Sequence, residues 1–562
     1  MNVLGIHSHG HDAGAALACG GRAFSISLER ITRMKHDGRF PAAAIRYVME
    51  QAGIGLGEVD LVVSDSLGFN TSDVRRALKK TGCRAPVEFI SHHEAHAASA
   101  YFTGPFREAA VLIIDAAGSY AGEMPGPRPP LAAHERSREL QSTYAGRDGR
   151  LTTVLKTFSA PGRAVGPGTP YGVGAMMAGY PDLEGGKLMA LAALGERGGL
   201  FPDCRFEDFE GHFLAPGDPE RDPLNPENIG YYSRLLFRGV PPRRAGEPVI
   251  QAQCEIARAV QEASAAAALE IALRLHSATG CRNLCVAGGF GLNCPANSAC
   301  LSSTPFSKIY VHPAANDSGI PLGAALYGRH EIAREPFRPM RFSPFLGKQY
   351  SPAVVKSELD LRPGIIYSRP RDFFRRAAEL LAEGKLCGWF HGGSEHGPRA
   401  LGNRSILAHP ALPGVKERLN ETVKLRESFR PYAPAVLAEK CGKYFRFKGE
   451  SPHMLLLAEA RPRWREKLAP VLHVDGTARL QTVSRRDNPA LRRLLEEFEL
   501  LTGLPLLLNT SFNRRGEPLV ETPGDAVECF LGTGLDFLAI QGFIASGKPE
   551  GALAERQPAG KP

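Results

Sequence analysis

Two histidines in the segment SHHEAHAASA are spaced so that they could share a metal ion. Residues four apart on a helix project from one face, which would place the imidazoles of His92 and His96 side by side. Histidines with this spacing also cap or cover helices without binding anything, so the pair alone leaves both interpretations open. Asp115 follows the apolar run VLII and Asp317 lies in the loop PAANDSG. Buried carboxylates are costly unless they meet a cation, which favours the metal.

The chemistry of this donor set narrows the choice of metal. Two imidazoles with carboxylates fit Fe(II), Zn(II) or Mn(II), and they leave coordination positions open for phosphate or water. A structural zinc site would instead use all four positions for protein ligands.

A second group of candidate residues combines cationic side chains with a serine and an asparagine. They lie in the strings SEHGPRALGNRSIL, KLRESFRPYAP, HVDGTARLQTV and LNTSFNRRGEP. Its members are Arg399, Arg404, Lys424, Arg430, Arg479, Ser511 and Asn513. Guanidinium groups bind phosphate or carboxylate through paired hydrogen bonds. These arginines are embedded among Gly, Pro and aromatic residues, unlike the scattered lysines of a generic charged surface. The strings therefore predict a pocket for a small polyanion.

Two loops after predicted strands could also face a ligand. His11 lies between the two opening strands, where a neutral imidazole could take a proton from an attacking hydroxyl, although a loop histidine is often satisfied by backbone. Gly288 and Gly289 end the run NLCVA and allow a ligand to approach the backbone, and Asn293 adds amide donors and acceptors. A glycine pair after a strand is otherwise an ordinary turn.

The elements that must position these residues are those of an α/β protein. The chain opens with a strand, a polar loop, a second strand, a CGGR turn and a third strand, and AAVLIIDAAG gives another strand followed by a small polar loop. This faint duplication is typical of actin-like ATPases. Helices are predicted over 41–52 and 253–276, and short strands over 60–64 and in NLCVA.

Stretches rich in proline or glycine indicate how the chain is divided into domains. Residues 121–150 are rich in Pro, Gly and charge and are expected to form a loop or insertion. The stretch EPFRPMRFSPFLGKQYSP holds four prolines and almost no periodicity, which predicts an inter-domain linker. We therefore expect a two-lobed domain over 1–345 and a second α/β domain over 346–562.

Composition limits the class of protein. The chain has 562 residues, 43% of them hydrophobic and 23% charged, which is enough for two or more cores. The net charge of +9 is mild and favours small anionic substrates over nucleic acid. Eleven cysteines without a CxxC pair argue against disulfides or a zinc ribbon, and no signal peptide or long apolar run is visible. We expect a cytoplasmic protein with no membrane and no nucleic-acid partner.

The motifs, in their order along the chain, resemble those of the nodulation-type O-carbamoyltransferases, which include the tobramycin carbamoyltransferase and relatives in antibiotic biosynthesis. The resemblance rests on HDAGAAL, ERITRMKH, HHEAHAASAYF, VLIIDAAG, AGGFGLNCPAN, PAANDSG, GPRALGNRSIL, FRPYAP, HVDGTARLQTV and LNTSFNRRGEP. It implies an N-terminal actin-like domain and a C-terminal YrdC-like domain. The YrdC-like domain would make carbamoyl adenylate from carbamoyl phosphate and ATP. The actin-like domain would transfer the carbamoyl group to a hydroxyl of a small natural product, such as a sugar, aminoglycoside or macrocycle.

The resemblance also implies roles for individual residues. The metal ligands would be His92, His96, Asp115 and Asp317, with Fe2+ as the metal and Mg2+ accompanying ATP, and His11 would be the base. The residues facing ATP or the adenylate would be Lys35, Gly288, Gly289, Asn293 and Asp317. Those holding carbamoyl phosphate would be Arg399, Lys424, Arg430, Arg479, Ser511 and Asn513. The sequence does not decide between a monomer and a homodimer.

One departure from the family pattern concerns the anion site. The family usually has an arginine shortly before the Glu of its GPRALG string, where this chain has Gly393 and Ser394, so one phosphate or carbamoyl contact is missing or supplied elsewhere. The stretch 121–150 is also longer and richer in proline than expected.

Two other functions are compatible with an actin-like fold. A tRNA threonylcarbamoyl-type transferase would need a basic stripe with interleaved aromatic residues, which is not evident. A non-catalytic actin-like ATP-binding module would leave the metal and arginine sets without a purpose. A hydrogenase-maturation carbamoyltransferase would carry paired CxxC motifs, and this chain has none.

Overall fold

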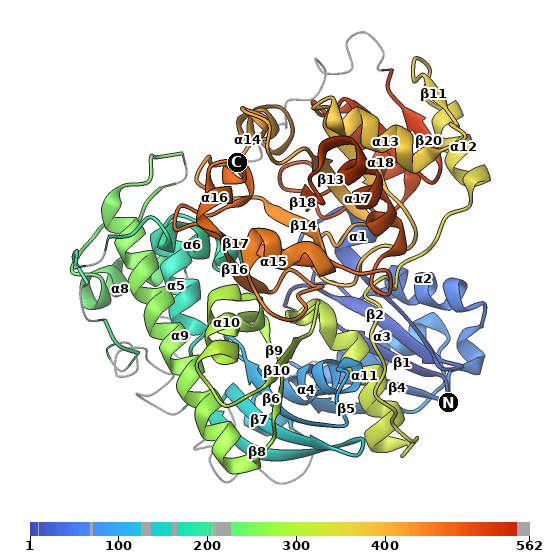
Figure 1. Cartoon of the computed structure of the whole chain (residues 1–562). Coiled ribbons are helices and arrows are strands. Elements are labelled where there is room, and N and C mark those ends of the chain that lie inside the picture. Colours follow the sequence, from blue (N-terminus) through green and yellow to red (C-terminus); the bar gives the residue numbers. More distant parts are fainter. Residues whose placement is uncertain are drawn as a thin grey trace. The chain divides into compact units, whose positions relative to one another are not determined.

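The computed structural model describes residues 1–8, 10–67, 71–124, 137–159, 166–196, 198–201, 204–206, 208, 226–244 and 246–547 (Figure 1). The chain divides into two compact units. The first unit comprises Met1–Leu28 and His36–Phe342, and the second comprises Glu29–Lys35 and Ser343–Pro562. The break after Phe342 falls inside the proline-rich stretch, and Glu29–Lys35 joins the second unit although it lies far from it in sequence.

The first unit contains two five-stranded sheets with the same topology. The first sheet has the order β3-β2-β1-β4-β5, with β1 and β2 antiparallel, β2 and β3 antiparallel, and β1, β4 and β5 parallel. Its strands are β1 (Val3–His7), β2 (Gly14–Cys19), β3 (Arg22–Ser27), β4 (Leu61–Ser66) and β5 (Val87–Ser91). The three opening strands and the strand predicted over 60–64 are confirmed.

The second sheet repeats this pattern strand for strand. Its order is β8-β7-β6-β9-β10, with β6 and β7 antiparallel, β7 and β8 antiparallel, and β6, β9 and β10 parallel. Its strands are β6 (Glu108–Ile114), β7 (Glu139–Arg147), β8 (Arg150–Phe158), β9 (Asn283–Ala287) and β10 (Lys308–Val311). The first unit is therefore built from two related lobes, and the predicted duplication is confirmed in the topology.

The prediction of a loop over 121–150 is wrong for its C-terminal part. Strand β7 pairs with β6 along its length, from Glu108 opposite Arg147 to Ile114 opposite Gln141. The sequence ELQSTYAGR shows no apolar alternation because its buried positions include a carboxylate and small hydroxyl side chains. Pairing on both sides of β7 therefore outweighs its weak strand pattern. Residues 125–136 of the expected insertion lie outside the described residues.

Two helices pack against each other and against the strands of the two sheets of the first unit. Helix α11 (Ile320–Tyr327) contacts β1, β2 and β4, and α4 (His92–Thr103) contacts β6 and β9. The two helices also pack against each other, with Gly323 at the contact, where a Cβ would lie 1.9 Å from the carbonyl oxygen of Ala95. Glycine at this position thus permits the close approach that brings the two lobes' strand ends together.

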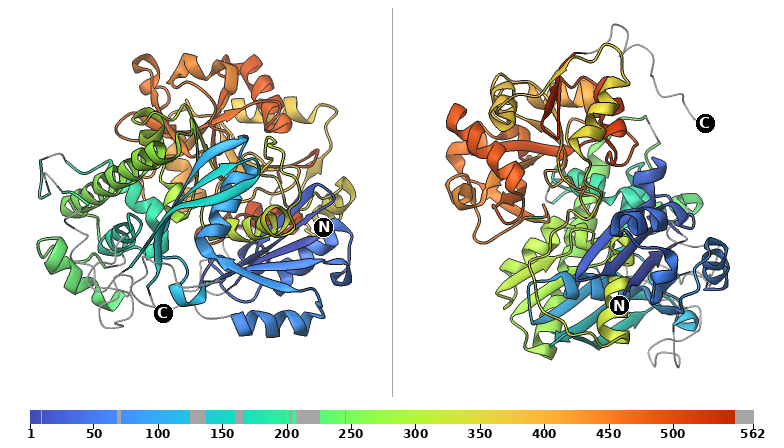
Figure 2. Two further views of the ribbon diagram at one scale, coloured as in Figure 1. Left: turned by 90° about the horizontal axis from the view of Figure 1, so that it is seen from below. Right: turned by 90° about the vertical axis from the view of Figure 1, so that its right-hand side faces the viewer.

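The longest helix of the first unit is α9 (Gln251–Thr279), drawn in green in Figure 2. It packs against β6 and β8, and against α5 (Thr169–Met177), α6 (Gly185–Ala192) and α10 (Cys294–Ser302). The helices predicted over 253–276 and 41–52 are confirmed, the latter as α2 (Ala42–Ala52). Among the described residues, no helix is both long and apolar enough to cross a membrane.

The second unit is built on a ten-stranded mixed sheet of order β11-β20-β19-β12-β13-β18-β14-β17-β16-β15. Its strands are β11 (Tyr367–Ser368), β20 (Phe543–Ala545), β19 (Phe537–Ile540), β12 (Cys387–Phe390), β13 (Arg404–Ala408), β18 (Leu506–Ser511), β14 (Ala433–Leu437), β17 (Thr477–Val483), β16 (Leu456–Ala460) and β15 (Phe445–Arg446). Helices α13 (Phe373–Ala382) and α17 (Pro489–Thr502) pack on each other and close a large apolar core. The α/β class is confirmed. The roles expected of the two domains stay a prediction.

Candidate functional site

The N-terminus of α4 presents the two histidines. Ser91 caps the helix: its Oγ accepts a hydrogen bond from the Glu94 amide at 3.3 Å, and the Glu94 carboxylate accepts one from the Ser91 amide at 3.2 Å. This capping box fixes the first turn. His92 is the first helical residue and His96 lies one turn later, and both side chains are buried.

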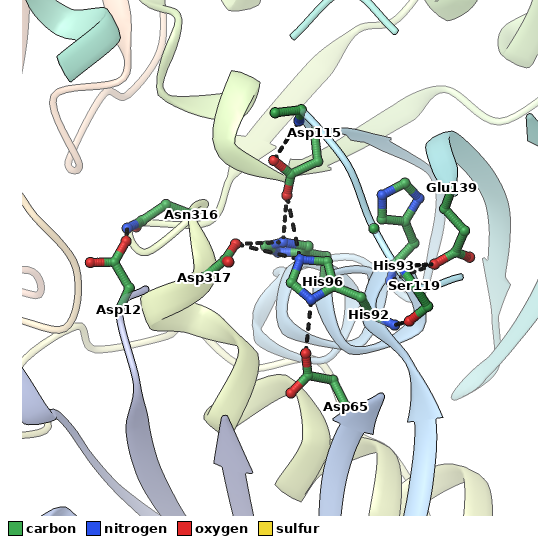
Figure 3. Close-up of polar contacts among 12 residues, drawn as sticks. Asp12, Asp65, His92, His93, His96, Asp115, Ser119, Glu139, Asn316 and Asp317 are labelled. Atoms are coloured by element: carbon green, nitrogen blue, oxygen red, sulfur yellow. Dashed lines mark hydrogen bonds and ion pairs between the residues drawn. The ribbon is translucent and has the colours of Figure 1, made fainter. Parts of the chain in front are cut away.

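Two buried carboxylates meet these imidazoles, as Figure 3 shows. Asp115 follows β6, and its Oδ2 lies 3.0 Å from the His96 Nε2 and 3.6 Å from the His92 Nε2. Asp317 lies beyond β10, and its Oδ1 is 3.5 Å from the His92 Nε2 and 3.4 Å from the His96 Nε2. One ligand atom from each residue lies within 4.8 Å of all the others. The structure thus brings together the four residues predicted to bind a metal.

The two buried carboxylates of this cluster are ionised, which favours binding of a cation. Burial alone would raise the pKa of the Asp115 carboxyl, but hydrogen bonds to His92 and His96 hold it well below its usual range. Burial likewise opposes ionisation of Asp317, and the nearby His92 and His11 keep its pKa well below normal. Two ionised, buried carboxylates beside two imidazole nitrogens are a donor set that a divalent cation fits. The four residues could hold such an ion and leave coordination positions for other ligands.

A further carboxylate orients the His92 imidazole through its Nδ1, the ring nitrogen that faces away from Asp115 and Asp317. Asp65, fully buried on β4, lies with its Oδ2 2.8 Å from the His92 Nδ1 and its Oδ1 2.9 Å from the His7 Nδ1. A carboxylate at Nδ1 fixes the tautomer in which Nε2 carries the free lone pair, as in second-shell contacts of metal sites. His7 uses its Nε2 on the carbonyl oxygen of His11, 3.1 Å away. Neither Asp65 nor His7 was predicted as a site residue, although an acid inside the buried run LVVSDS is the signal that pointed to Asp115.

His11 lies at the edge of the cluster. Its Nδ1 is 3.2 Å from the Asp12 Oδ2 and 3.7 Å from the Asp317 Oδ2. Burial lowers the pKa of His11, but Asp317 and Asp12 outweigh it and raise the pKa to about 9. A cation bound to Asp317 would reverse this effect and favour the neutral imidazole.

Asp12 holds this corner of the first unit in place. Besides His11, it meets the His36 Nδ1 at 2.8 Å. It also accepts a hydrogen bond from the Asn316 amide at 3.0 Å (Figure 3). Its backbone has a φ of 56°, a strained conformation for a residue other than glycine. Three side-chain contacts therefore stabilise the turn that carries His11.

The predicted nucleotide loop lies next to Asp115. Gly288 has a φ of 85°, and a Cβ there would lie 2.2 Å from the carbonyl oxygen of Ile114. A Cβ on Gly289 would lie 3.1 Å from the Asp115 Oδ1, so both glycines border the carboxylate directly. Asn293 caps α10 through the Ala296 amide at 3.1 Å and pairs with Gln261. A nucleotide contact by these residues stays a prediction.

In the second unit, two of the predicted anion-binding residues, Ser511 and Asn513, surround a third, the buried Lys424. The Lys424 ammonium donates to the Ser511 carbonyl oxygen at 2.8 Å and to the Asn513 Oδ1 at 2.8 Å, and it lies 3.2 Å from the Ser511 Oγ. Burial lowers the pKa of Lys424 to about 7, helped by the positive charges of Arg426, Arg430 and Lys35. A cluster of cations that suppresses a lysine's charge is suited to receive an anion.

The remaining cationic candidates differ in their surroundings. Arg430 lies near Lys424 and 3.6 Å from the Glu427 carboxylate, and Arg479 on β17 lies near enough to Arg426 to lower its pKa. Arg399 lies in the loop between β12 and β13. Lys35 belongs to the second unit, whereas Gly289 and Asn293, with which it was grouped as nucleotide contacts, belong to the first.

Arg404 does not fit an anion pocket. Its side chain is fully buried, with the guanidinium 3.5 Å from the centre of the Phe390 ring. Nη1 donates to the carbonyl oxygen of Gly392 at 3.0 Å. The structure therefore gives Arg404 a structural role that its position among the other arginines did not reveal.

Comparison with known proteins assigns the family. The family model described as Carbamoyltransferase N-terminus matches residues 2–76, 69–201 and 246–326. The model described as Carbamoyltransferase C-terminus matches residues 378–546. Together these matches span most of both units.

Relatives that align with most of this chain support this result. The chain is 32% identical to the uncharacterized protein sll1178 of Synechocystis sp., over 97% of this chain and 96% of that protein. It is 34% identical to nodulation protein NolNO of Sinorhizobium fredii, over 95% of this chain and 78% of that protein. It is also 34% identical to nodulation protein U of Rhizobium tropici, over 78% of this chain and 72% of that protein.

Among solved structures, HypF of T. kodakarensis aligns with 59% of this chain and 48% of its own, at 12% identity and a TM-score of 0.33. The assignment rests on the sequence matches, which cover both units and include relatives at more than 30% identity over nearly the whole chain. The chain belongs to the carbamoyltransferase family and is a carbamoyltransferase enzyme.

Proposed function

We propose that this carbamoyltransferase uses carbamoyl phosphate and ATP to form carbamoyl adenylate, and transfers the carbamoyl group to a hydroxyl of a small natural product. The observation that carries the proposal is the chemistry of the two candidate sites. The first unit offers two imidazoles and two carboxylates for a divalent cation beside His11, and the second offers a buried cationic pocket around Lys424.

The first step would occur at the cationic pocket. Water cleaves carbamoyl phosphate to carbamate and phosphate, and a carbamate oxygen then attacks the α-phosphorus of ATP and expels pyrophosphate. Lys424 and Arg430 would neutralise the phosphoryl oxygens, while Ser511 and Asn513 orient the ammonium of Lys424. Carbamate decomposes in water, so an enclosed pocket would protect it.

The second step would occur in the first unit. The acceptor oxygen forms a bond to the carbamoyl carbon, the bond from that carbon to the AMP phosphate oxygen breaks, and the hydroxyl proton leaves to His11. A divalent cation held by His92, His96, Asp115 and Asp317 would supply Lewis-acid polarisation and charge neutralisation. Gly288 and Gly289 would let the nucleotide approach the Asp115 carboxylate closely.

The proposal is tested by pyrophosphate release from ATP by the purified chain, with and without carbamoyl phosphate and with Mg2+ present. We expect release only when carbamoyl phosphate is present, with carbamoyl adenylate detectable by mass spectrometry. Absence of both products over a range of divalent metals would refute the proposal. Acceptors can then be sought among hydroxyl-bearing metabolites by the mass gain of one carbamoyl group.

A further inference from the structure

One arginine of the second unit keeps unused hydrogen-bond donors in a buried position. Arg30 is 3% exposed, and its Nη2 donates to the carbonyl oxygen of Gly397 at 2.7 Å. Its Nε and Nη1 are buried and make no hydrogen bond to any described residue. The Glu29 carboxylate makes a long ion pair with Nε, at 3.9 Å. A buried guanidinium with two unmet donors is costly unless an anion completes it.

The position of Arg30 is imposed by its neighbours on the same segment. Arg33 donates from Nη1 to the Leu519 carbonyl oxygen at 2.6 Å and from Nη2 to the Pro518 carbonyl oxygen at 2.9 Å. Its guanidinium also lies 3.7 Å from the Glu517 carboxylate. These contacts fasten the segment Glu29–Lys35 to the second unit, so the unmet donors of Arg30 do not result from a loosely held side chain.

The short segment that carries Arg30 also reaches the cationic cluster around Lys424. Gly397, which accepts its one hydrogen bond, lies two residues before Arg399 in the same loop. Lys35, five residues after Arg30, is close enough to Lys424 to lower the pKa of that lysine. His396 is neutral beside Arg30, since burial and the guanidinium lower the pKa of His396 to about 3.

Gly393 lies in the same loop as Gly397 and packs closely against the backbone of another segment of the second unit. A Cβ on Gly393 would lie 2.4 Å from the carbonyl oxygen of Gly347, so any larger side chain there would displace the backbone. This loop position therefore carries no side chain, and Arg30, on α1 (Leu28–Thr32), is a buried cation that reaches the loop at Gly397.

We propose that Arg30 binds a phosphoryl group in the cationic pocket, through its unpartnered Nη1. This inference rests on the proposed function and extends it to a residue of the Glu29–Lys35 segment. Carbamoyl phosphate and ATP both carry phosphate oxygens, so either substrate is a candidate for the group that Arg30 binds. The guanidinium suits such a group better than a lysine would, because its charge is permanent and its donors are held in a fixed plane.

The test compares two arginines of one segment. Arg30→Gln removes the charge and keeps a polar side chain, whereas Arg33→Gln weakens only the anchoring of the segment. Losing a buried charged contact typically weakens binding by about 30-fold or more. We therefore expect the KM for carbamoyl phosphate or for ATP to rise by about that factor in Arg30→Gln, with little change in Arg33→Gln. The substrate whose KM rises identifies the source of the phosphoryl group, and Arg30→Lys should give an intermediate value.

A direct binding measurement separates this inference from the proposed function. Inorganic phosphate and carbamoyl phosphate are titrated calorimetrically into folded wild-type protein, Arg30→Gln and Arg30→Lys, without any need for turnover. Weaker binding to Arg30→Gln supports the inference even if no pyrophosphate is ever released. Wild-type affinity in Arg30→Gln, or equal changes in the Arg30 and Arg33 variants, would overturn it.

Discussion

Replacing Asp65 with asparagine tests whether the candidate metal site depends on a residue that touches no ion. Asp65 is buried and accepts two hydrogen bonds, from the Nδ1 atoms of His92 at 2.8 Å and His7 at 2.9 Å. An asparagine side chain has one acceptor oxygen, and its NH2 group would face the N–H of the second imidazole. The substitution therefore keeps one of these bonds and turns the other contact into a clash of donors.

The size of the effect follows from these contacts. A hydrogen bond to a charged group contributes about 1.5–3 kcal/mol. Loss of second-shell partners lowers metal affinity by about 10- to 100-fold, since the ligand loses its fixed orientation. If His92 turns its Nε2 away from Asp115 and Asp317, the cation keeps three of its four ligands. We expect a metal Kd that is about 10- to 100-fold higher.

The assay is competition between the protein and a chromophoric chelator for Zn2+ or Mn2+, with urea unfolding of the metal-free protein measured in parallel. Asp60→Asn is the matched control, because it is the same change just before the same strand, on an exposed side chain that meets no histidine. A wild-type metal affinity in folded Asp65→Asn would refute the positioning role.

Two further predictions concern buried charges. Glu139 is fully buried and bonds to Ser91 at the start of α4 and to the Lys156 ammonium at 2.9 Å. Glu139→Gln should therefore lower the free energy of unfolding, measured by urea denaturation, by about 3 kcal/mol. Adding Lys156→Met should recover part of this lost stability, because it removes the charge left unpaired. Burial favours the neutral acid, but His93 and Lys156 outweigh it and lower the pKa of Glu139 to about 2, so its stabilisation should persist above its unfolded pKa and disappear as the pH falls toward 2. Lys424, whose pKa is about 7 without ligand, should take up a proton when an anion binds at pH 7–8 because the anion raises that pKa. Calorimetry of carbamoyl phosphate binding in buffers of different ionisation enthalpy measures this uptake, and Lys424→Met should abolish it.

Local patterns were enough to predict the strands and helices that carry strong periodicity. The three opening strands, the helices over 41–52 and 253–276 and the duplicated strand-loop unit follow from apolar spacing and turn residues. Strand β7 did not, because Glu139, Ser142 and Thr143 are buried polar residues that break the alternation. Its place between β6 and β8 depends on pairing across the sheet, which no local window contains.

Sequence patterns likewise predicted some residues of the candidate site and missed others. The spacing of His92 and His96 and the acids after buried runs pointed to four residues that the structure brings within 4.8 Å. Asp65 was missed because its role depends on contacts with helix α4 and strand β1, which lie far away in sequence. Arg30 was missed for the same reason, since its partner Gly397 is 367 residues away.

The measurement that tests the account most directly is single-turnover pyrophosphate release by two variants. The account places ATP activation in the second unit and carbamoyl transfer in the first. His11→Ala should therefore release one equivalent of pyrophosphate at the wild-type rate when carbamoyl phosphate is present, whereas Arg430→Ala should release almost none. Equal loss in both folded variants would contradict the division of the reaction between the two sites.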